Sequence, residues 1–203
     1  MTAVSGIVLA GGQSKRLGTD KALLPFGGRT LLEVVVGRLR EVTDDIVIAC
    51  GAGHRPGWPT DVEARLVLDR VSGRGPLSGL EAGLRAAAHD AAAVVACDMP
   101  FLNPALLRYM VDLLDDNDAV APVVNGRLHA LHAVFTKRCL GAVDELLARG
   151  GSMQGLLEAV RTVIVAEDAV LTIDPAGLSC FNLNSPADLE KARSLWPQMH
   201  AAL

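Results

Sequence analysis

The sequence predicts an α/β domain in which a mostly parallel sheet is flanked by helices. Short β-branched runs alternate along the chain with longer amphipathic runs, as strands alternate with helices in such domains. The expected strands are apolar on both faces, which is typical of a parallel sheet covered on both sides. A chain of 203 residues is long enough for one domain with a sizeable core. We therefore treat residues 1–203 as a single domain.

The first half of the chain, residues 1–116, shows the more regular alternation. Its expected strands cover residues 5–10, 45–50, 65–69 and 93–97. Its expected helices cover residues 30–42, 77–89 and 103–116. The last of these has the clearest start, because Asn103 can cap the helix and Pro104 suits its first turn.

The second half, residues 117–203, is less regular. Its expected strands cover residues 120–124, 130–135 and 163–165, and helices are expected near 137–148 and 152–160. A final helix is expected to begin at Ser185, where Pro186 follows the capping residue and Asp188 lies three positions on.

The composition excludes several classes of protein. A net charge of −4 argues against a general nucleic-acid binder, which needs a basic face. No run of 18 apolar residues and no basic signal-peptide segment is present, so we expect no membrane partner and a cytoplasmic location. The four cysteines are each more than 40 residues from the next, which predicts separate reduced thiols and no zinc site.

A glycine-rich turn with three cations follows the first expected strand. Gly11 and Gly12 come directly after it, and Lys15, Arg16 and Lys21 follow. Ligands of open α/β sheets bind beyond the carboxyl ends of the strands, and glycine allows the positive φ angles that turn N–H groups toward one anion. The spacing fits neither a P-loop nor a dinucleotide-binding fingerprint. The turn predicts either another type of phosphate site or a plain turn with solvated lysines.

Four segments resemble, in order, motifs of the molybdenum cofactor guanylyltransferase family. These segments are LAGGQSKRLGTDKALLP at 9–25, RGPLSGL at 74–80, CDMPFL at 97–102 and NLNSPADL at 182–189. The resemblance implies a Rossmann-like nucleotidyltransferase fold, with a nucleotide-binding half over 1–116 and an acceptor-binding half over 117–203. It also implies the transfer of GMP from GTP to the terminal phosphate of molybdopterin, with Mg²⁺ as cofactor and release of pyrophosphate.

The resemblance assigns roles to individual residues. The expected nucleotide contacts are Leu9, Ala10, Gly11, Gly12, Lys21, Asp69 and Asp98. The expected catalytic residues are Arg16, Lys21 and Asp98, with Asp98 as the Mg²⁺ ligand because this ion prefers carboxylate oxygens. The expected acceptor contacts are Asn182 and Asn184. The attacking phosphate is ionised near neutral pH, so positioning and charge neutralisation can supply most of the rate without a general base.

The residues themselves leave plainer alternatives open. Asp98 could cap the turn before the 103–116 helix, Asp69 could be a surface turn acid, and the two asparagines could satisfy turn backbone groups. His129 and His132 are three apart on an expected strand and so would point to opposite faces, which argues against a shared metal ion. Structural or acceptor-contact roles are expected for both.

Two departures from the family pattern leave the substrates open. Ala49 stands where the family tends to place an asparagine near the base, and residues 129–131 read His-Ala-Leu in place of His-Pro-Leu. A cytidylyltransferase acting on molybdopterin or another phosphorylated acceptor stays open, as does a regulatory module that binds a nucleotide without chemistry. A transient protein that delivers molybdopterin is compatible with the resemblance, and the oligomeric state stays open.

Overall fold

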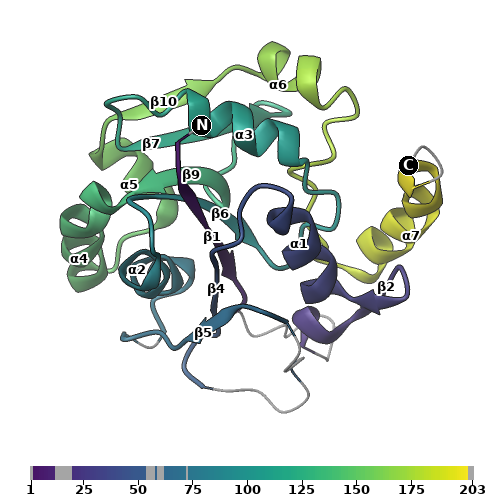
Figure 1. The fold of residues 1–203 in the computed structure, drawn as a ribbon, viewed down its shortest axis with the longest axis horizontal. Coiled ribbons are helices and arrows are strands. Elements are labelled where there is room, and N and C mark those ends of the chain that lie inside the picture. The colour runs from purple at the N-terminus through teal and green to yellow at the C-terminus, as the bar shows by residue number, and fades with distance from the viewer. Residues whose placement is uncertain (1, 12–19, 54–57, 59–61, 72, 201–203) are drawn as a thin grey trace.

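A computed structural model describes residues 2–11, 20–53, 58, 62–71 and 73–200 (Figure 1). The main sheet has the strand order β10-β7-β9-β6-β1-β4-β5, and β8 pairs with β7. Its strands are β1 (Val4–Leu9), β4 (Ile46–Ala49), β5 (Arg65–Val67), β6 (Ala91–Ala96), β7 (Ala119–Val124), β8 (Arg127–Leu128), β9 (His132–Thr136) and β10 (Thr162–Val165). A separate hairpin consists of β2 (Pro25–Phe26) and β3 (Arg29–Thr30).

The helices of the described residues connect these strands. They are α1 (Leu31–Arg40), α2 (Pro76–Ala86), α3 (Pro104–Asp112), α4 (Leu140–Arg149), α5 (Met153–Ala159), α6 (Glu167–Ile173) and α7 (Pro186–His200), with short 3-10 turns η1 (Lys21–Leu23) and η2 (Lys137–Cys139). Side chains cap the starts of α1, α3 and α5. Thr30 and Glu33 form a capping box on α1, and the Asn103 side chain accepts from Ala105 N at the start of α3.

The predicted α/β class with a mostly parallel sheet is confirmed. β1 pairs in parallel with both β4 and β6, β5 extends the sheet from β4, and β10 pairs in parallel with β7. Two strands depart from this pattern: β9 lies antiparallel between β6 and β7, and the two-residue β8 pairs antiparallel with β7. The sheet therefore runs continuously from strands of residues 1–116 into strands of residues 117–203.

Helices cover both faces of the sheet. Alternate residues of β1 point to opposite sides: Val8 joins the core under α1 and α3, and Ile7 joins the core under α2 and α4. Figure 1 shows α2 and α4 on one side of β1 and α1 and α3 on the other. Helix α2 packs closely, since a Cβ at Gly83 would lie 2.6 Å from Ile7 Cγ2.

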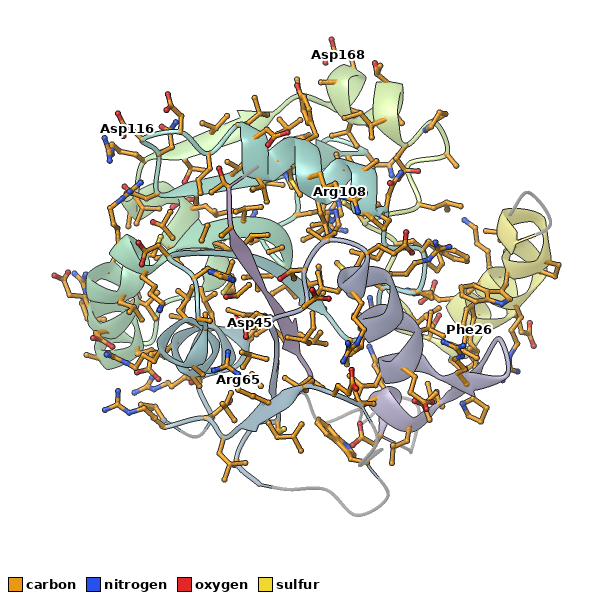
Figure 2. All side chains as sticks on the ribbon, viewed as in Figure 1. Phe26, Asp45, Arg65, Arg108, Asp116 and Asp168 are labelled. Carbon is orange, nitrogen blue, oxygen red and sulfur yellow. The ribbon has the colours of Figure 1, made fainter. Side chains whose placement is uncertain are left out.

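The two ends of the sheet differ in their polar contacts. At the amino ends, the Asp45 carboxylate accepts from the buried Ser5 hydroxyl at 2.5 Å and pairs with Arg65 at 2.5 Å. These contacts tie β1, β4 and β5 together, and Figure 2 shows Asp45 and Arg65 side by side. The carboxyl ends instead lead into the glycine-rich turn and the predicted site residues.

A third apolar cluster holds the C-terminal helix. The Phe26 ring of the β2–β3 hairpin lies 4.7 Å, centroid to centroid, from the Trp196 ring of α7. Figure 2 labels Phe26 where the hairpin lies beside α7. Phe101 contacts both of these rings, and Phe181 contacts Phe101. This cluster positions residues 182–185, which precede α7 in the sequence.

The element boundaries differ from the prediction in three instructive places. Helix α3 ends at Asp112 and not at residue 116, because Asp115 adopts a left-handed φ of 38° that a helix cannot contain. Helix α6 was not expected, since seven residues carry too little periodicity. Strand β9 begins at His132, so His129 precedes it in a turn.

The cysteines and the lengths of the helices bear on two further predictions. Cys50, Cys97, Cys139 and Cys180 are all buried, and they lie in separate parts of the fold. None of the helices within the described ranges is long and apolar enough to cross a bilayer.

Candidate active site

The predicted phosphate-binding turn begins where two glycines meet across neighbouring strands. Gly11 follows β1 and Gly51 follows β4, and a Cβ on Gly11 would lie 2.8 Å from the Gly51 Cα. Gly51 has a left-handed φ of 78°, whereas Gly11 is not among the positive-φ glycines. The positive φ predicted for Gly11 is therefore wrong, and close backbone approach is what requires glycine there.

The other members of this turn divide into two groups. Leu9 and Ala10 are buried, and they hydrogen-bond through their backbones: Leu9 O accepts from Cys97 N at 3.1 Å, and Ala10 N donates to Ala49 O at 2.9 Å. Gly12 and Arg16 lie outside the described residues. The expected nucleotide contact of Gly12 and the expected catalytic role of Arg16 therefore stay predictions.

Three predicted site residues from distant parts of the chain meet at the end of β6. Lys21 Nζ donates to Asp98 Oδ2 at 2.8 Å and to Asn184 Oδ1 at 2.9 Å. The side chains of Lys21 and Asp98 are 19% and 14% exposed, so both still reach solvent. Leu183 N donates to the Asp98 carbonyl at 2.9 Å, which fixes the segment before α7 against the end of β6. The structure thus joins the first, third and fourth sequence motifs.

Local structure holds the Lys21 backbone in place. Asp20 caps η1, because its Oδ1 accepts from Ala22 N at 3.1 Å. Its other carboxylate oxygen accepts from the Trp58 indole N–H at 3.0 Å, and Trp58 is buried. Asp20, which was not among the predicted site residues, is therefore a positioning residue for Lys21.

The structural alternative for Asp98 does not hold. Helix α3 is capped by Asn103, whose Oδ1 accepts from Ala105 N at 2.9 Å, and the Asp98 carboxylate pairs with Lys21. A single carboxylate with solvent access at a strand end suits Mg²⁺, whose other ligands are commonly phosphates and water. Among the described residues no group of three or more His, Cys, Asp or Glu side chains could hold a metal ion alone. A metal at Asp98 would therefore complete its coordination largely with oxygens of water or of a substrate.

Asp69 lies at the end of the neighbouring β4–β5 pair. Asp69 N donates to Gly51 O at 2.8 Å, and Asp69 Oδ1 is buried without a hydrogen-bond partner among the residues that the structure describes. Burial raises the pKa of the Asp69 carboxyl above its ordinary value, and the nearby Glu81 carboxylate adds to this effect. Arg70 forms its ion pair with Glu81, at 2.7 Å, and not with Asp69. This half-buried acid is not the surface turn acid of the plainer alternative.

Ala49 faces the core beneath helix α2. Its side chain is 1% exposed, and a Cβ on Gly79 would lie 3.2 Å from the Ala49 Cβ. The position where the family tends to carry an asparagine therefore offers no polar contact in this chain. Asp69, which lies 3.7 Å from the same Cβ position on Gly79, is the polar group available nearby.

A pocket of about 450 Å³ adjoins the Lys21–Asp98–Asn184 contact. It is lined by Arg74, Pro76, Leu77, Met99, Arg127, Leu128, His129, Ala130, Leu131, Gly151, Ser152, Met153, Gln154, Asn182 and Asn184. Both predicted acceptor contacts are thus in its wall, and the Asn182 Oδ1 is buried without a hydrogen-bond partner among the described residues. Sequence reasoning missed Arg127 and Gln154, which belong to none of the four motifs.

The two histidines have separate environments. His129 lines the pocket and its Nε2 lies 3.2 Å from the Val124 carbonyl oxygen; burial lowers the pKa of the ring, as does the charge of Arg127. His132 is completely buried, and its Nε2 lies 3.1 Å from the Ser179 hydroxyl. Burial lowers the pKa of His132 to about 3, so this ring is neutral. The role of His132 is therefore structural.

Comparison with known proteins agrees with this geometry. A family model described as the MobA-like NTP transferase domain matches residues 6–169. The chain belongs to the MobA-like NTP transferase family. The family predicted from the four motifs is confirmed, and so is the prediction that the chain is a nucleotidyltransferase. Enzymes of this kind generally use a divalent metal ion.

Curated relatives of this MobA-like chain match it over nearly its whole length. A probable molybdenum cofactor guanylyltransferase of Pelotomaculum thermopropionicum is 38% identical over 197 residues, which cover 95% of this chain and 93% of the relative. One of Mycobacterium avium with the same name is 39% identical over 193 residues, which cover 92% of this chain and 93% of the relative.

Solved structures share the MobA-like fold. Molybdopterin-guanine dinucleotide biosynthesis protein A of Archaeoglobus fulgidus superposes with a TM-score of 0.82 at 24% identity, covering 97% of this chain and all of its own. The 2-C-methyl-D-erythritol 4-phosphate cytidylyltransferase of Thermus thermophilus has a TM-score of 0.71 at 21% identity, with coverages of 96% and 98%. At these identities the likeness shows the nucleotidyltransferase fold alone.

Proposed function

We propose that this MobA-like NTP transferase is a molybdenum cofactor guanylyltransferase, which transfers GMP from GTP to the terminal phosphate of molybdopterin. The observation that carries the proposal is the contact of Lys21 with Asp98 and Asn184 at the rim of the pocket. It brings a phosphate-binding cation, a metal-binding carboxylate and an acceptor-facing amide to one point. The names of the relatives at 38% and 39% identity support the choice of reaction.

The distance between Asp98 and Asp69 along the edge of the sheet suits a bound nucleotide. Asp98 follows β6 and Asp69 follows β5, which lies three strands away in the order β6-β1-β4-β5. Neighbouring strands are about 4.8 Å apart, so the two acids are separated by roughly 14 Å, on the order of the length of a nucleoside phosphate. The unpartnered oxygen of Asp69 can accept N–H groups of guanine, while Lys21 and Asp98 serve the phosphates.

Asp98 would hold Mg²⁺ with the help of the nucleotide phosphates. When bound there, Mg²⁺ would neutralise part of the negative charge of the triphosphate. Lys21 adds a further positive charge and, together with Asn184, keeps the Asp98 carboxylate oriented. Arg16 is proposed to contribute another cation to the same phosphates.

The reaction needs no nucleophilic side chain. An ionised oxygen of the molybdopterin phosphate attacks the α-phosphorus of GTP and forms the new phosphoanhydride bond. The bond from the α-phosphorus to the oxygen that bridges to the β-phosphate breaks, and pyrophosphate leaves with that electron pair. The residues of the site act by binding, orienting and neutralising charge, as is usual for phosphoryl-type transfer.

The pocket suits a flat heterocycle with hydrogen-bonding edges. Leu77, Leu131 and Met153 provide apolar walls, and Asn182 and Asn184 provide amide groups. Asn182 Oδ1 lacks a partner among the described residues, so a ring N–H of the acceptor could donate to it without displacing a protein contact.

Product identification with each of the four nucleoside triphosphates, Mg²⁺ and molybdopterin tests the proposal. We expect GTP, and none of the other three nucleotides, to give a dinucleotide product and pyrophosphate. A product from CTP would identify a cytidylyltransferase. Nucleotide binding without pyrophosphate release from any of the four would identify a regulatory module.

A further inference from the structure

Two arginines line the pocket without a hydrogen-bond or ion-pair partner among the residues that the structure describes. Arg74 and Arg127 are exposed, and the described residues provide neither guanidinium with an ion pair or a hydrogen bond. This differs from most arginines of the described chain, which pair with an acid. Those pairs involve Arg38, Arg40, Arg65, Arg70, Arg85, Arg138, Arg149 and Arg161. No Asp or Glu is among the described residues that line the pocket.

The two arginines come from opposite halves of the sequence. Arg74 precedes helix α2 and reaches toward the loop between α4 and α5, since its Nη1 lies 3.0 Å from the position of a Cβ on Gly150. Arg127 follows the β7–β8 turn, in which Asn125 and Gly126 both have positive φ. The backbone N–H groups of Asn125 and Gly126 donate to the Glu167 carboxylate at 2.6 and 3.3 Å. These bonds hold the turn against helix α6.

The charge of Arg127 acts inside the pocket. It lowers the pKa of His129, which lines the same pocket, after the larger effect of burial. A neutral His129 leaves Arg127 and Arg74 as the full positive charges among the described lining residues. A pocket with two such guanidiniums and no acid is suited to an anionic group, which guanidinium binds through paired N–H donors.

This anionic group is not the phosphate that receives GMP. That phosphate has to reach the α-phosphorus beside Lys21 and Asp98, and neither residue lines the pocket. Asn184 and Met99 connect the two places: Asn184 accepts from Lys21, Met99 follows Asp98, and both are in the pocket wall. The arginines thus belong to the neighbouring space, which the rest of the acceptor would fill.

We propose that Arg74 and Arg127 bind a second anionic group of the acceptor, at a distance from its phosphate. The inference rests on the proposed function. In molybdopterin the group is the dithiolene, either as the free dithiolate or as its oxo-molybdenum complex. The two arginines then select acceptors that carry charge at both ends over simple phosphate monoesters.

Equilibrium binding to Arg74→Gln and Arg127→Gln tests this inference. The ligands are molybdopterin, a pterin alkyl phosphate that lacks the dithiolene, and GTP, with pterin fluorescence as the signal for the first two. Arg149→Gln is the control, because Arg149 pairs with Glu145 on α4 and does not line the pocket. Loss of one charge-assisted contact should weaken molybdopterin binding by about tenfold or more, and should change the other two affinities by about twofold or less.

Three outcomes would overturn the inference. Unchanged molybdopterin binding in both variants removes the arginines from the acceptor site. If the affinity for the pterin alkyl phosphate falls as much as that for molybdopterin, the arginines bind the acceptor phosphate. If the affinity for GTP falls as much, they bind the triphosphate.

Turnover separates this inference from the proposed function. A wild-type protein whose molybdopterin binding depends on the arginines, yet which forms no guanine dinucleotide, contradicts the proposed function and supports the arginine site. A wild-type protein that forms the product, with variants that bind molybdopterin normally, contradicts the arginine site alone.

Discussion

Lys21 and Asp98 form an ion pair at 2.8 Å, although 77 residues separate them in the sequence. The pair joins the 3-10 turn after the glycine-rich segment to the end of β6. In a nucleotide-free protein the ammonium group therefore occupies one oxygen of the proposed metal ligand. Lys21 and a metal ion compete for Asp98, unless a phosphate is present to bind the lysine.

Lys21→Ala should abolish most of the activity without unfolding the protein. The removal of one preorganised cation should lower GMP transfer by about 10²–10³-fold. The same change frees Asp98, so Mn²⁺ should bind the nucleotide-free variant more tightly than the wild type, which electron paramagnetic resonance can measure. Unchanged turnover would remove Lys21 from the site, and unchanged Mn²⁺ affinity would contradict the competition.

Asp69→Asn should separate nucleotide binding from stability. The Asp69 carboxyl has a raised pKa because it is buried and close to Glu81, so a neutral amide should leave the melting temperature equal or higher. GTP affinity should fall, since the unpartnered acceptor oxygen is the proposed base contact. Calorimetric titration with GTP checks this, with Asp112→Asn on the exposed face of α3 as the control. If Asp69→Asn binds GTP as tightly as the wild type does, Asp69 is not a base contact and its role is structural.

Gly11→Ala should destabilise the fold as well as the site. The new Cβ would lie 2.8 Å from the Gly51 Cα, and backbone cannot move aside cheaply. Overpacking of this kind costs about 1–3 kcal/mol, and each kcal/mol lowers the melting temperature by roughly 2–4 °C in a chain of this size. Gly53→Ala is the matched control, because no described atom lies within 4 Å of its Cβ position. Equal melting temperatures would contradict the close approach of the two strand ends.

His132 should make the protein less stable in mild acid. Its folded pKa of about 3 lies below the ordinary value of 6.5, so below pH 6.5 only the unfolded chain takes up the proton. This contribution to stability is present above pH 6.5 and is lost as the pH falls toward 3, at up to about 1.4 kcal/mol per pH unit. Denaturant titrations at pH 7 and pH 5 should show a smaller loss for His132→Gln than for the wild type and for the His89→Gln control. Equal losses in all three proteins would refute the assignment.

The sequence predicted the fold well because long periodic elements dominate it. The strands of residues 1–116 and the helices α1, α2 and α3 have clear patterns, and side chains cap the starts of α1 and α3. Helix α6 and strand β8 in the second half have neither a clear pattern nor a capping side chain. Helix α6 and strand β8 are set by contacts distant in sequence, such as that of Glu167 with the β7–β8 turn, and such contacts leave no local pattern.

The site was predicted from motifs and not from geometry. Lys21, Asp98 and Asn184 belong to three motifs, and the fold brings these three side chains together. The requirement for glycine at position 11 was predicted for the wrong reason, because it depends on Gly51 of a neighbouring strand. Arg127 escaped prediction altogether, since an arginine after a hairpin turn is ordinary until the fold places it in a pocket.

Pyrophosphate release by Asp98→Ala, measured beside its thermal melt, tests the central claim most directly. The pair with Lys21 still reaches solvent and is worth at most about 1 kcal/mol, so the variant should fold and melt near the wild type. Turnover with GTP, Mg²⁺ and molybdopterin should fall by about 10²–10³-fold or more, and excess metal should restore little. A variant with normal turnover per folded molecule would contradict the assignment of metal binding to Asp98, and with it the proposed mechanism.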